Sequence, residues 1–359
     1  MTSRSSRRDR PSPANRVAEL DRLQEGSTGE RLRSLDALRG LAIVVMLLAG
    51  SPFMREYLPI QLKHPEWHGL RFADLFFPLF LFVVGIAMTI SRRTGQPRLV
   101  LRRVVLLALV GVVLTSLKHE RLAVFGVLQH IAGSYLLAWL VLRSPKWMQP
   151  VLVAGILLGV WAGFLLYAGD GQDPWSMQDS FAHSVNEWFT GGFSTEGFVQ
   201  TIASSVTVLG GAFVGRMVKD RRDPPVLARR VAFHAAWLIV VALLVSIEVP
   251  INKRLWSPSF TLLTLSTSCA WFALLIWLID IRRQRWWVGP LQELGANPIA
   301  VYVGFITVRA LSSDFGDAVP QLAPFGSEVA GSMTYAFGWL ALGWFFAHLL
   351  YRRKIFLRL

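Results

Sequence analysis

The segment Lys63–Gly85 reads KHPEWHGLRFADLFFPLFLFVVG and decides how the rest of the chain is interpreted. A polar stretch with two histidines, His64 and His68, runs directly into a strongly apolar run that begins with the acid Asp74. Ionisable groups are costly to place at the edge of a hydrocarbon layer, and an ordinary loop does not need them there. A histidine titrates near neutrality and can take a proton from an attacking amine or hydroxyl. The segment therefore predicts a reactive centre where a membrane helix meets water.

The composition of the whole chain is that of a membrane protein. Of its 359 residues, 53% are hydrophobic and only 17% are charged, against roughly 25% charged residues in a soluble domain. Several apolar runs approach the ~20 residues that a helix needs to cross a bilayer. The runs are continuous rather than alternating, which argues against a β-barrel. We therefore expect an all-α fold, a polytopic transmembrane helical bundle.

The chain carries a formal net charge of +14. Binding to nucleic acid is one explanation, but the cations lie between the apolar runs, as the positive-inside rule expects. We therefore predict no nucleic-acid partner. The single cysteine, Cys269, lies within an apolar run, so no disulfide framework is expected in a monomer.

About ten membrane spans can be drawn from the apolar runs. They are Ala37–Phe53, Asp74–Ile90, Val104–Leu117, Val124–Leu142, Val151–Ala168, Gly197–Met217, Val231–Val249, Phe260–Ile279, Leu291–Leu311 and Gly331–Tyr351. The third is short and is expected to be tilted or partly re-entrant. Arginines and lysines concentrate in alternate connections, and the stretch 169–196 has none. This asymmetry places both termini in the cytosol, and His64 and His68 on the outer side.

Residues 1–33 are rich in Arg, Ser, Pro and Glu and poor in large apolar side chains. Such a composition cannot bury a core, so we expect a disordered basic cytosolic tail. The first apolar run comes too late for this segment to be a signal peptide. Residues 34–359 then form one transmembrane domain.

The two histidines allow two interpretations. His64 and His68 are four residues apart and would share one face of a helix, as metal ligands often do. Pro65 and Gly69 oppose a regular helix, and no third ligand is evident, so we predict no metal site. A general base is favoured instead. Asp74 would be the carboxylate that orients the base, the N-cap of the second span, or both.

Polar residues in two other spans are further candidates. Asp36 and Arg39 lie three positions apart on one helical face. They form either an ion pair that anchors the helix, or a site in which Arg39 faces an anionic ligand from the cytosol. Gln129 and His130 lie within the fourth span. A buried polar pair of this kind either bonds to another helix or lines a cavity.

Two later motifs combine polar and aromatic residues. In PINKRLWSPSF, Asn252, Lys253 and Trp256 are either interface anchors or part of a site at the outer surface. In LGANPIAVYVG, Asn297 stands directly before a proline, and Tyr302 follows within two turns. An Asn–Pro step inside a span leaves a backbone carbonyl without its helical partner, often where the helix lines a cavity.

Six motifs, in this order, resemble the heparan-α-glucosaminide N-acetyltransferase family and its bacterial relatives. They are SLDALRGLAIVVMLL, KHPEWHGLRFADLFFPLFLFVVG, GVLQHIA, STEG, PINKRLWSPSF and LGANPIAVY, and they cover nearly everything after the N-terminal tail. The second and fifth motifs are quite specific, whereas the SLDxLRG opening also resembles other membrane acyltransferases. The resemblance implies a transmembrane acyltransferase that takes acetyl from cytosolic acetyl-CoA and places it on a terminal glucosamine amine across the membrane.

The resemblance also implies roles for individual residues. By motif, the active-site histidine is His64, and the acid that follows it is Asp74. The family's polar cluster corresponds to Asn252, Lys253 and Trp256, and its ninth-span pair to Asn297 and Tyr302. With the candidates from the residues themselves, the full set expected to bind the acyl donor is Arg39, Gln129, His130, Asn252, Lys253, Trp256, Asn297 and Tyr302. Two positions depart from the family pattern: Gly50 or Ser51 stands where the family has an Asn, and His130 stands where it has an Arg.

We therefore predict an acyl-CoA-dependent N- or O-acetyltransferase in the bacterial inner membrane, with residues 34–359 as its transmembrane acyltransferase domain. His64 would act as general base on an amino or hydroxyl group of a sugar or glycan on the extracytoplasmic side. The expected partners are acyl-CoA, a glycan or amino-sugar acceptor and membrane lipid, with a homodimer also considered. The alternative is a transporter or flippase of a glycan or lipid-linked sugar, without acyl chemistry.

Overall fold

The computed structural model describes residues 32–51, 55–119, 122–168, 172–190, 194, 196–220, 223–311 and 327–356. Within these ranges the protein is helical and has no β-strand, which confirms the all-α prediction. The α-helices are α2 (Arg33–Ala49), α3 (Phe76–Ile90), α4 (Pro97–His119), α5 (Val127–Arg143), α6 (Met148–Tyr167), α7 (Phe181–Thr190), α8 (Phe198–Lys219), α9 (Pro224–Val245), α10 (Pro258–Leu275), α11 (Val288–Ala296), α12 (Pro298–Leu311) and α13 (Glu328–Arg352). The predicted tail, residues 1–33, lies almost wholly outside the described ranges and stays a prediction.

Short helical turns complete the chain. They are η1 (Arg55–Tyr57), η2 (Ile60–Leu62), η3 (Phe72–Leu75), η4 (Arg92–Gly95) and η5 (Ile276–Ile281). The turn η3 leads directly into α3, and η5 is a π-helical turn that extends α10. The chain between η2 and η3 contains His64 and His68.

Among the described residues, seven helices are long and apolar enough to cross a membrane, by length and composition. They are α3 with η3, α4, α6, α8, α9, α10 with η5, and α13. The other predicted spans coincide with the shorter helices α2, α5 and α12. The protein is therefore a multi-pass membrane protein. The count of ten crossings and the cytosolic position of both termini stay predictions.

Two predicted spans differ from the structure. The third is not short, because α4 has 23 residues and begins at Pro97. It includes Arg103, whose guanidinium lies 4.8 Å from the centre of the Tyr135 ring, so its charge lies against an aromatic face. The ninth, Leu291–Leu311, is divided into α11 and α12. The division falls at Pro298 because proline lacks the N–H that would continue the helix.

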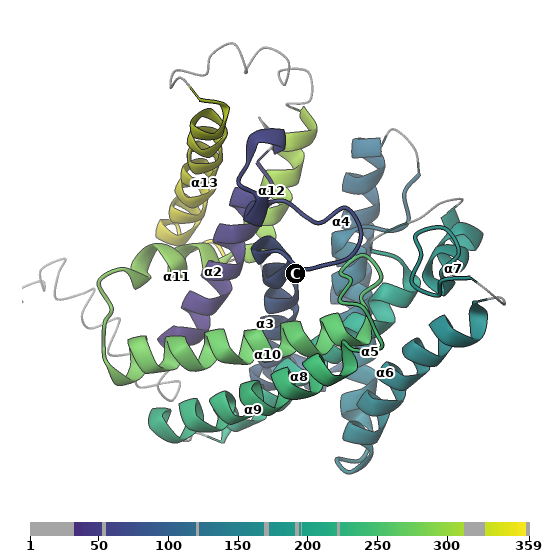
Figure 1. Ribbon diagram of the computed structural model, residues 1–359. Helices are drawn as coiled ribbons and strands as arrows, with labels where there is room; N and C mark the ends of the chain where they lie inside the picture. Colours follow the sequence, from purple (N-terminus) through teal and green to yellow (C-terminus); the bar gives the residue numbers. More distant parts are fainter. Residues whose placement is uncertain are drawn as a thin grey trace, which may run out of the picture.

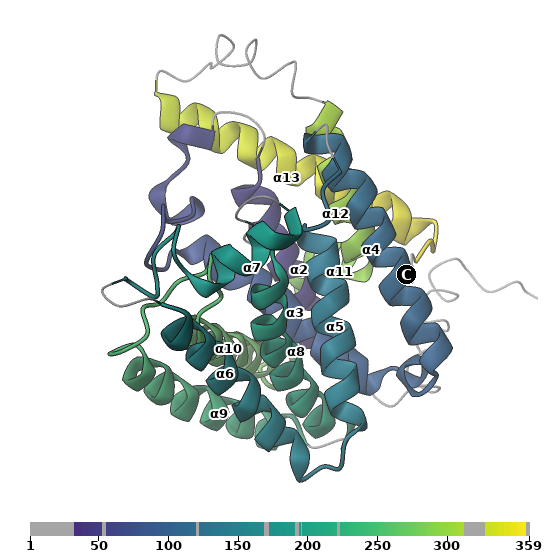
Figure 2. The same ribbon diagram turned by 90° about the vertical axis from the view of Figure 1, so that its right-hand side faces the viewer.

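The centre of the bundle is the close contact between α3 and α8, which lie side by side in Figures 1 and 2. A Cβ placed on Gly211 would lie 2.0 Å from the carbonyl oxygen of Phe82. A Cβ placed on Gly85 would lie 1.9 Å from the carbonyl oxygen of Val208. Glycine at both positions therefore lets the two backbones approach closely. The helices α2, α5 and α10 also pack against α3, so the helix in which the segment Lys63–Gly85 ends is enclosed by protein.

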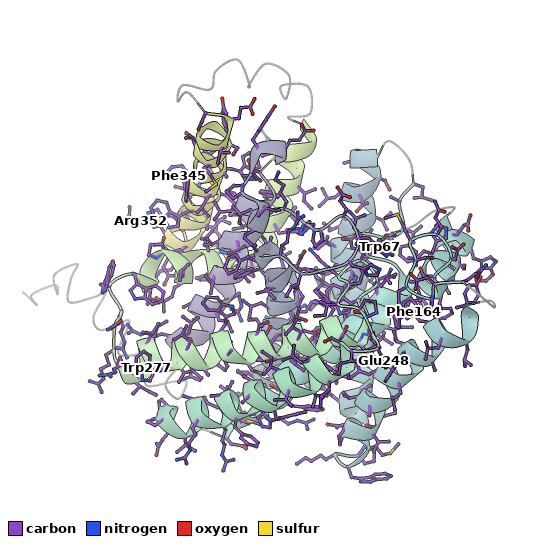
Figure 3. All side chains as sticks on the ribbon, in the orientation of Figure 1. Trp67, Phe164, Glu248, Trp277, Phe345 and Arg352 are labelled. Atoms are coloured by element: carbon purple, nitrogen blue, oxygen red, sulfur yellow. The ribbon has the colours of Figure 1, made fainter. Side chains whose placement is uncertain are left out.

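The helices α4, α6, α9 and α13 instead expose most of their apolar surface. Phe345 of α13, labelled in Figure 3, is one example and is 54% exposed. Soluble proteins rarely expose large contiguous apolar patches. We therefore assign these surfaces to contact with the hydrocarbon of the bilayer.

The α3–α8 contact generates a stability prediction. Gly211→Ala should lower the free energy of unfolding by about 1–3 kcal/mol, because the added methyl meets backbone atoms of α3 that cannot rotate away. The matched control is Gly155→Ala in α6, where an added Cβ meets no atom within 4 Å. The control should be neutral or slightly stabilising. Unfolding in mixed detergent, followed by circular dichroism, measures both. Equal effects of the two substitutions would contradict the packing account.

Candidate active site

The segment from His64 to Asp74 is held against the loop before α10 by backbone pairing. The N–H of Gly69 donates to the carbonyl of Ile251 at 2.9 Å, and Gly69 pairs with Asn252 as an isolated parallel bridge. Gly69 has a φ of 107°, a backbone conformation that residues with a side chain rarely adopt. This glycine therefore lets two segments far apart in the sequence lie side by side.

Arg71 fixes the local shape of the same segment. Its backbone N–H donates to Asp74 Oδ2 at 2.9 Å, and the N–H of Asp74 donates to the Arg71 carbonyl, also at 2.9 Å. These reciprocal bonds close the turn η3. The guanidinium of Arg71 donates to the carbonyl of His64 at 3.0 Å. Arg71 thus links the turn that carries the acid to the residue that carries the imidazole.

Asp74, His64 and Lys253 form the centre of the candidate site. Asp74 Oδ1 lies 2.6 Å from His64 Nδ1 and 3.0 Å from Lys253 Nζ. The Asp74 side chain is fully buried, whereas that of His64 is 38% exposed. An ionised carboxylate can only accept hydrogen bonds, so a neutral His64 donates from Nδ1 and has its lone pair on Nε2. This is the tautomer in which an oriented histidine can act as a base.

Lys253 lies over the imidazole as well as beside the carboxylate. Its Nζ is 3.1 Å from Nδ1 and 3.4 Å from Nε2 of His64. An atom that lies in the ring plane along the lone pair of one ring nitrogen is much farther from the other nitrogen. The ammonium therefore sits over the ring face. From there its positive charge balances the buried negative charge of Asp74.

Asn252, the neighbour of Lys253, is buried and ties the loop together. Its Oδ1 accepts from the N–H of Leu255 at 3.0 Å, and its backbone N–H donates to Ser257 Oγ at 3.1 Å. Its Nδ2 lies 3.2 Å from Nδ1 of His68. The structure therefore places Asn252 with His68 and places Lys253 with His64.

Trp256 lies inside the bundle beside His130. It is 1% exposed and has a φ of 54°. Its ring centre is 4.9 Å from that of His130 and 5.7 Å from that of Phe77. Within the described part of the chain, Trp256 Nε1 and both ring nitrogens of His130 have no hydrogen-bond partner. Each such buried group costs about 1–3 kcal/mol, so this cluster is a strong candidate for contact with a polar ligand.

Gln129, the neighbour of His130 in α5, faces α4 instead. Both amide atoms of its side chain also have no hydrogen-bond partner among the described residues. The side chain packs against Gly111 of α4, where an added Cβ would meet Gln129 Oε1. The described contacts show neither a hydrogen bond from Gln129 to another helix nor a cavity at its side chain, so both interpretations of the Gln129–His130 pair stay predictions.

The other three predicted donor-binding residues lie elsewhere. Arg39 Nη1 is 3.4 Å from Asp36 Oδ1 and 3.3 Å from the carbonyl of Gly295, where α2 meets α11. Asn297 is buried, and its Nδ2 donates to the carbonyl of Ile355 at 2.8 Å. Tyr302 lines two small apolar cavities, one between α2 and α12 and one that α3 and α5 also line. The structure thus brings His64, Asp74 and Lys253 together. Arg39, Asn297 and Tyr302 have no contact with that group among those described above.

Sequence reasoning did not find three other members of the site. They are Arg71 and the pair formed by Trp67 and Trp175, in which Trp67 Nε1 donates to the Trp175 carbonyl at 2.8 Å. No local pattern indicates the contact between Trp67 and Trp175, because these residues are more than a hundred positions apart. In the part of the chain that the structure describes, no group of three His, Cys, Asp or Glu side chains is placed to hold a metal ion.

The buried ion pair generates a second prediction. Asp74→Asn and Lys253→Met should each destabilise the protein, and the double variant should be less destabilised than the sum. The expected coupling is about 1–3 kcal/mol, because Lys253 loses its negative partner once Asp74 is neutral. Denaturant unfolding of the four proteins measures the coupling. The control cycle pairs Asp74→Asn with Lys219→Met, at the exposed end of α8, and should be additive. Additivity in both cycles would contradict a coupled pair.

Comparisons with known proteins show which family the chain resembles. The family described as "Heparan-alpha-glucosaminide N-acetyltransferase, catalytic" matches residues 31–245, which include His64, Asp74 and His130. The chain is 26% identical to the heparan-alpha-glucosaminide N-acetyltransferase of Homo sapiens over 91% of its length, and 25% identical to that of Mus musculus over 92%. It spans 59% and 61% of these two relatives. The chain belongs to the heparan-alpha-glucosaminide N-acetyltransferase catalytic family.

Proposed function

We propose that this protein is a membrane acyltransferase. It moves an acetyl group from cytosolic acetyl-CoA to an amino or hydroxyl group of a sugar on the extracytoplasmic side. Membership of an acetyltransferase family supports the reaction class. The contact between His64 Nδ1 and the buried Asp74 carboxylate supports His64 as the general base, and it is the observation that carries the proposal.

The chemistry assigns one role to each member of the centre. His64 Nε2 removes a proton from the acceptor as its nitrogen or oxygen attacks the thioester carbonyl. Asp74 holds the ring in orientation and stabilises the imidazolium that forms. The tetrahedral intermediate collapses, the carbon–sulfur bond breaks, and the proton on His64 passes to the departing thiolate. The products are the acetylated sugar and free CoA.

Lys253 is suited to stabilise negative charge in this reaction. Its ammonium lies 3.4 Å from Nε2 of His64, the atom that must meet the acceptor. Charge develops on the carbonyl oxygen in the tetrahedral intermediate and on sulfur as the thiolate leaves. A fixed cation in a site with little water stabilises such charge more strongly than the same cation in bulk water. Asn252 supports this role indirectly, since it holds the loop that carries Lys253.

The donor approaches from inside the bundle in this proposal. The pantetheine arm of acetyl-CoA contains two amides, which need hydrogen-bond partners inside a membrane protein. Trp256, His130 and Gln129 offer donors and acceptors without partners in the described residues. Arg39 would meet the phosphates at the cytosolic end of α2, where Asn297 would also line the route. Tyr302 would line it farther out, beside Ile43 of α2 and Leu128 of α5. Placement in a bacterial inner membrane, ten crossings and a homodimer belong to the same proposal.

The first functional prediction concerns the base. His64→Ala should lower acetyl transfer from radiolabelled acetyl-CoA to glucosamine by at least about a hundredfold, as expected for loss of a general base. The matched control is His348→Ala. His348 Nδ1 also contacts a carboxylate, Glu293 Oε1 at 3.0 Å, but lies on α13. The control variant should keep near wild-type transfer.

Two results would contradict the proposal. Transfer by His64→Ala at the wild-type rate would remove His64 from the mechanism. Movement of sugar across vesicles that contain the purified protein, without any acyl donor and without acetylated product, would favour a transporter instead.

A further inference from the structure

The orientation of the Asn252 side chain is fixed by its own contacts. Its Oδ1 accepts a hydrogen bond from the N–H of Leu255 at 3.0 Å, so this side of the amide must be the oxygen. The other side is therefore the NH₂ group. It lies 3.2 Å from Nδ1 of His68 and can only donate.

This contact determines where His68 carries its proton. A ring nitrogen that accepts from an amide has no proton of its own, so the proton of a neutral His68 is on Nε2. His64 has the opposite arrangement, because its Nδ1 donates to Asp74. Two histidines four residues apart are thus held in opposite tautomers, His68 by Asn252 and His64 by Asp74. His64 presents a hydrogen-bond acceptor at Nε2, whereas His68 presents a hydrogen-bond donor at Nε2.

An indole is fixed beside this donor. The ring centres of Trp67 and His68 are 6.0 Å apart in an edge arrangement. Trp67 Nε1 donates to the carbonyl of Trp175, which is itself 7% exposed. Trp175 packs on Phe164, with ring centres 4.9 Å apart. Figure 3 shows the labelled Trp67 and Phe164 on the same side of the molecule. Trp67 is therefore held by its hydrogen bond to Trp175, while the side chain of His68 is exposed.

We propose that Trp67 and His68 form the subsite that binds the sugar acceptor. A pyranose has an apolar face of C–H groups and a rim of hydroxyls. The indole of Trp67 contacts the apolar face, and His68 Nε2–H donates to a ring hydroxyl oxygen. This inference rests on the proposed function, because it assumes that the acceptor reaches His64 from the outer side. Neither residue takes part in bond making or breaking, so the subsite governs acceptor affinity.

Substitution of His68 tests the subsite directly. His68→Phe keeps an aromatic ring but removes the donor, and should raise the acceptor KM about three- to tenfold, as loss of one hydrogen bond implies. The KM for acetyl-CoA should not change. His68→Gln can accept from Asn252 and still donate outward, so it should restore part of the affinity. The control is His234→Phe on α9, where the half-buried ring accepts from an indole, Trp237 Nε1, at 2.9 Å, and this substitution should leave both KM values unchanged.

A binding measurement separates this inference from the reaction itself. Equilibrium dialysis with radiolabelled methyl glucosaminide, without acetyl-CoA, should show binding by the wild type and weaker binding by His68→Phe. This result supports the subsite even if the wild type transfers no acetyl group, which would defeat only the proposed function. The subsite is overturned if the wild type binds no sugar, if His68→Phe binds it equally well, or if the substitution changes the acetyl-CoA KM to the same extent.

Discussion

The buried carboxylate of Asp74 is the constraint on which the rest of the site depends. A charge removed from water is costly unless other charges and hydrogen bonds compensate it. Asp74 has three such partners: the imidazole of His64, the ammonium of Lys253 and the backbone N–H of Arg71. His64 and Arg71 belong to the segment Lys63–Gly85, and Lys253 belongs to the loop before α10. Satisfying one carboxylate therefore joins two segments far apart in the sequence and orients the ring between them.

Much of the fold could be predicted from the sequence, because a bilayer sets the length of an apolar run. Every predicted span coincides with helix in the described residues, although Leu291–Leu311 is divided at Pro298 and α4 is longer than expected. Hydrophobicity alone could not show which helices are central. Interior and lipid-facing surfaces are both apolar, and the α3–α8 contact is recognised from the structure by the close approach at glycines such as Gly85 and Gly211.

The site was less predictable than the fold. The residue types and the family motifs pointed to His64, Asp74 and Lys253, yet neither gives their distances. Trp256 had two interpretations, and its position inside the bundle beside His130 follows from a backbone with positive φ that no local pattern indicates. The contacts of His68 and Trp67 depend on Asn252 and Trp175, which come from distant parts of the chain. Such pairings are tertiary, so a single sequence does not specify them.

The central claim is that a thioester reaches His64 from within the bundle. The most direct measurement is a cryo-electron microscopy structure of the protein with a non-hydrolysable thioether analogue of acetyl-CoA. The account predicts that the carbon equivalent to the acetyl carbonyl lies beside Nε2 of His64 and near Lys253, with the pantetheine amides bonded near Trp256 and His130. An analogue bound with its sulfur away from His64, or a His64 ring turned away from Asp74 in the complex, would contradict the account.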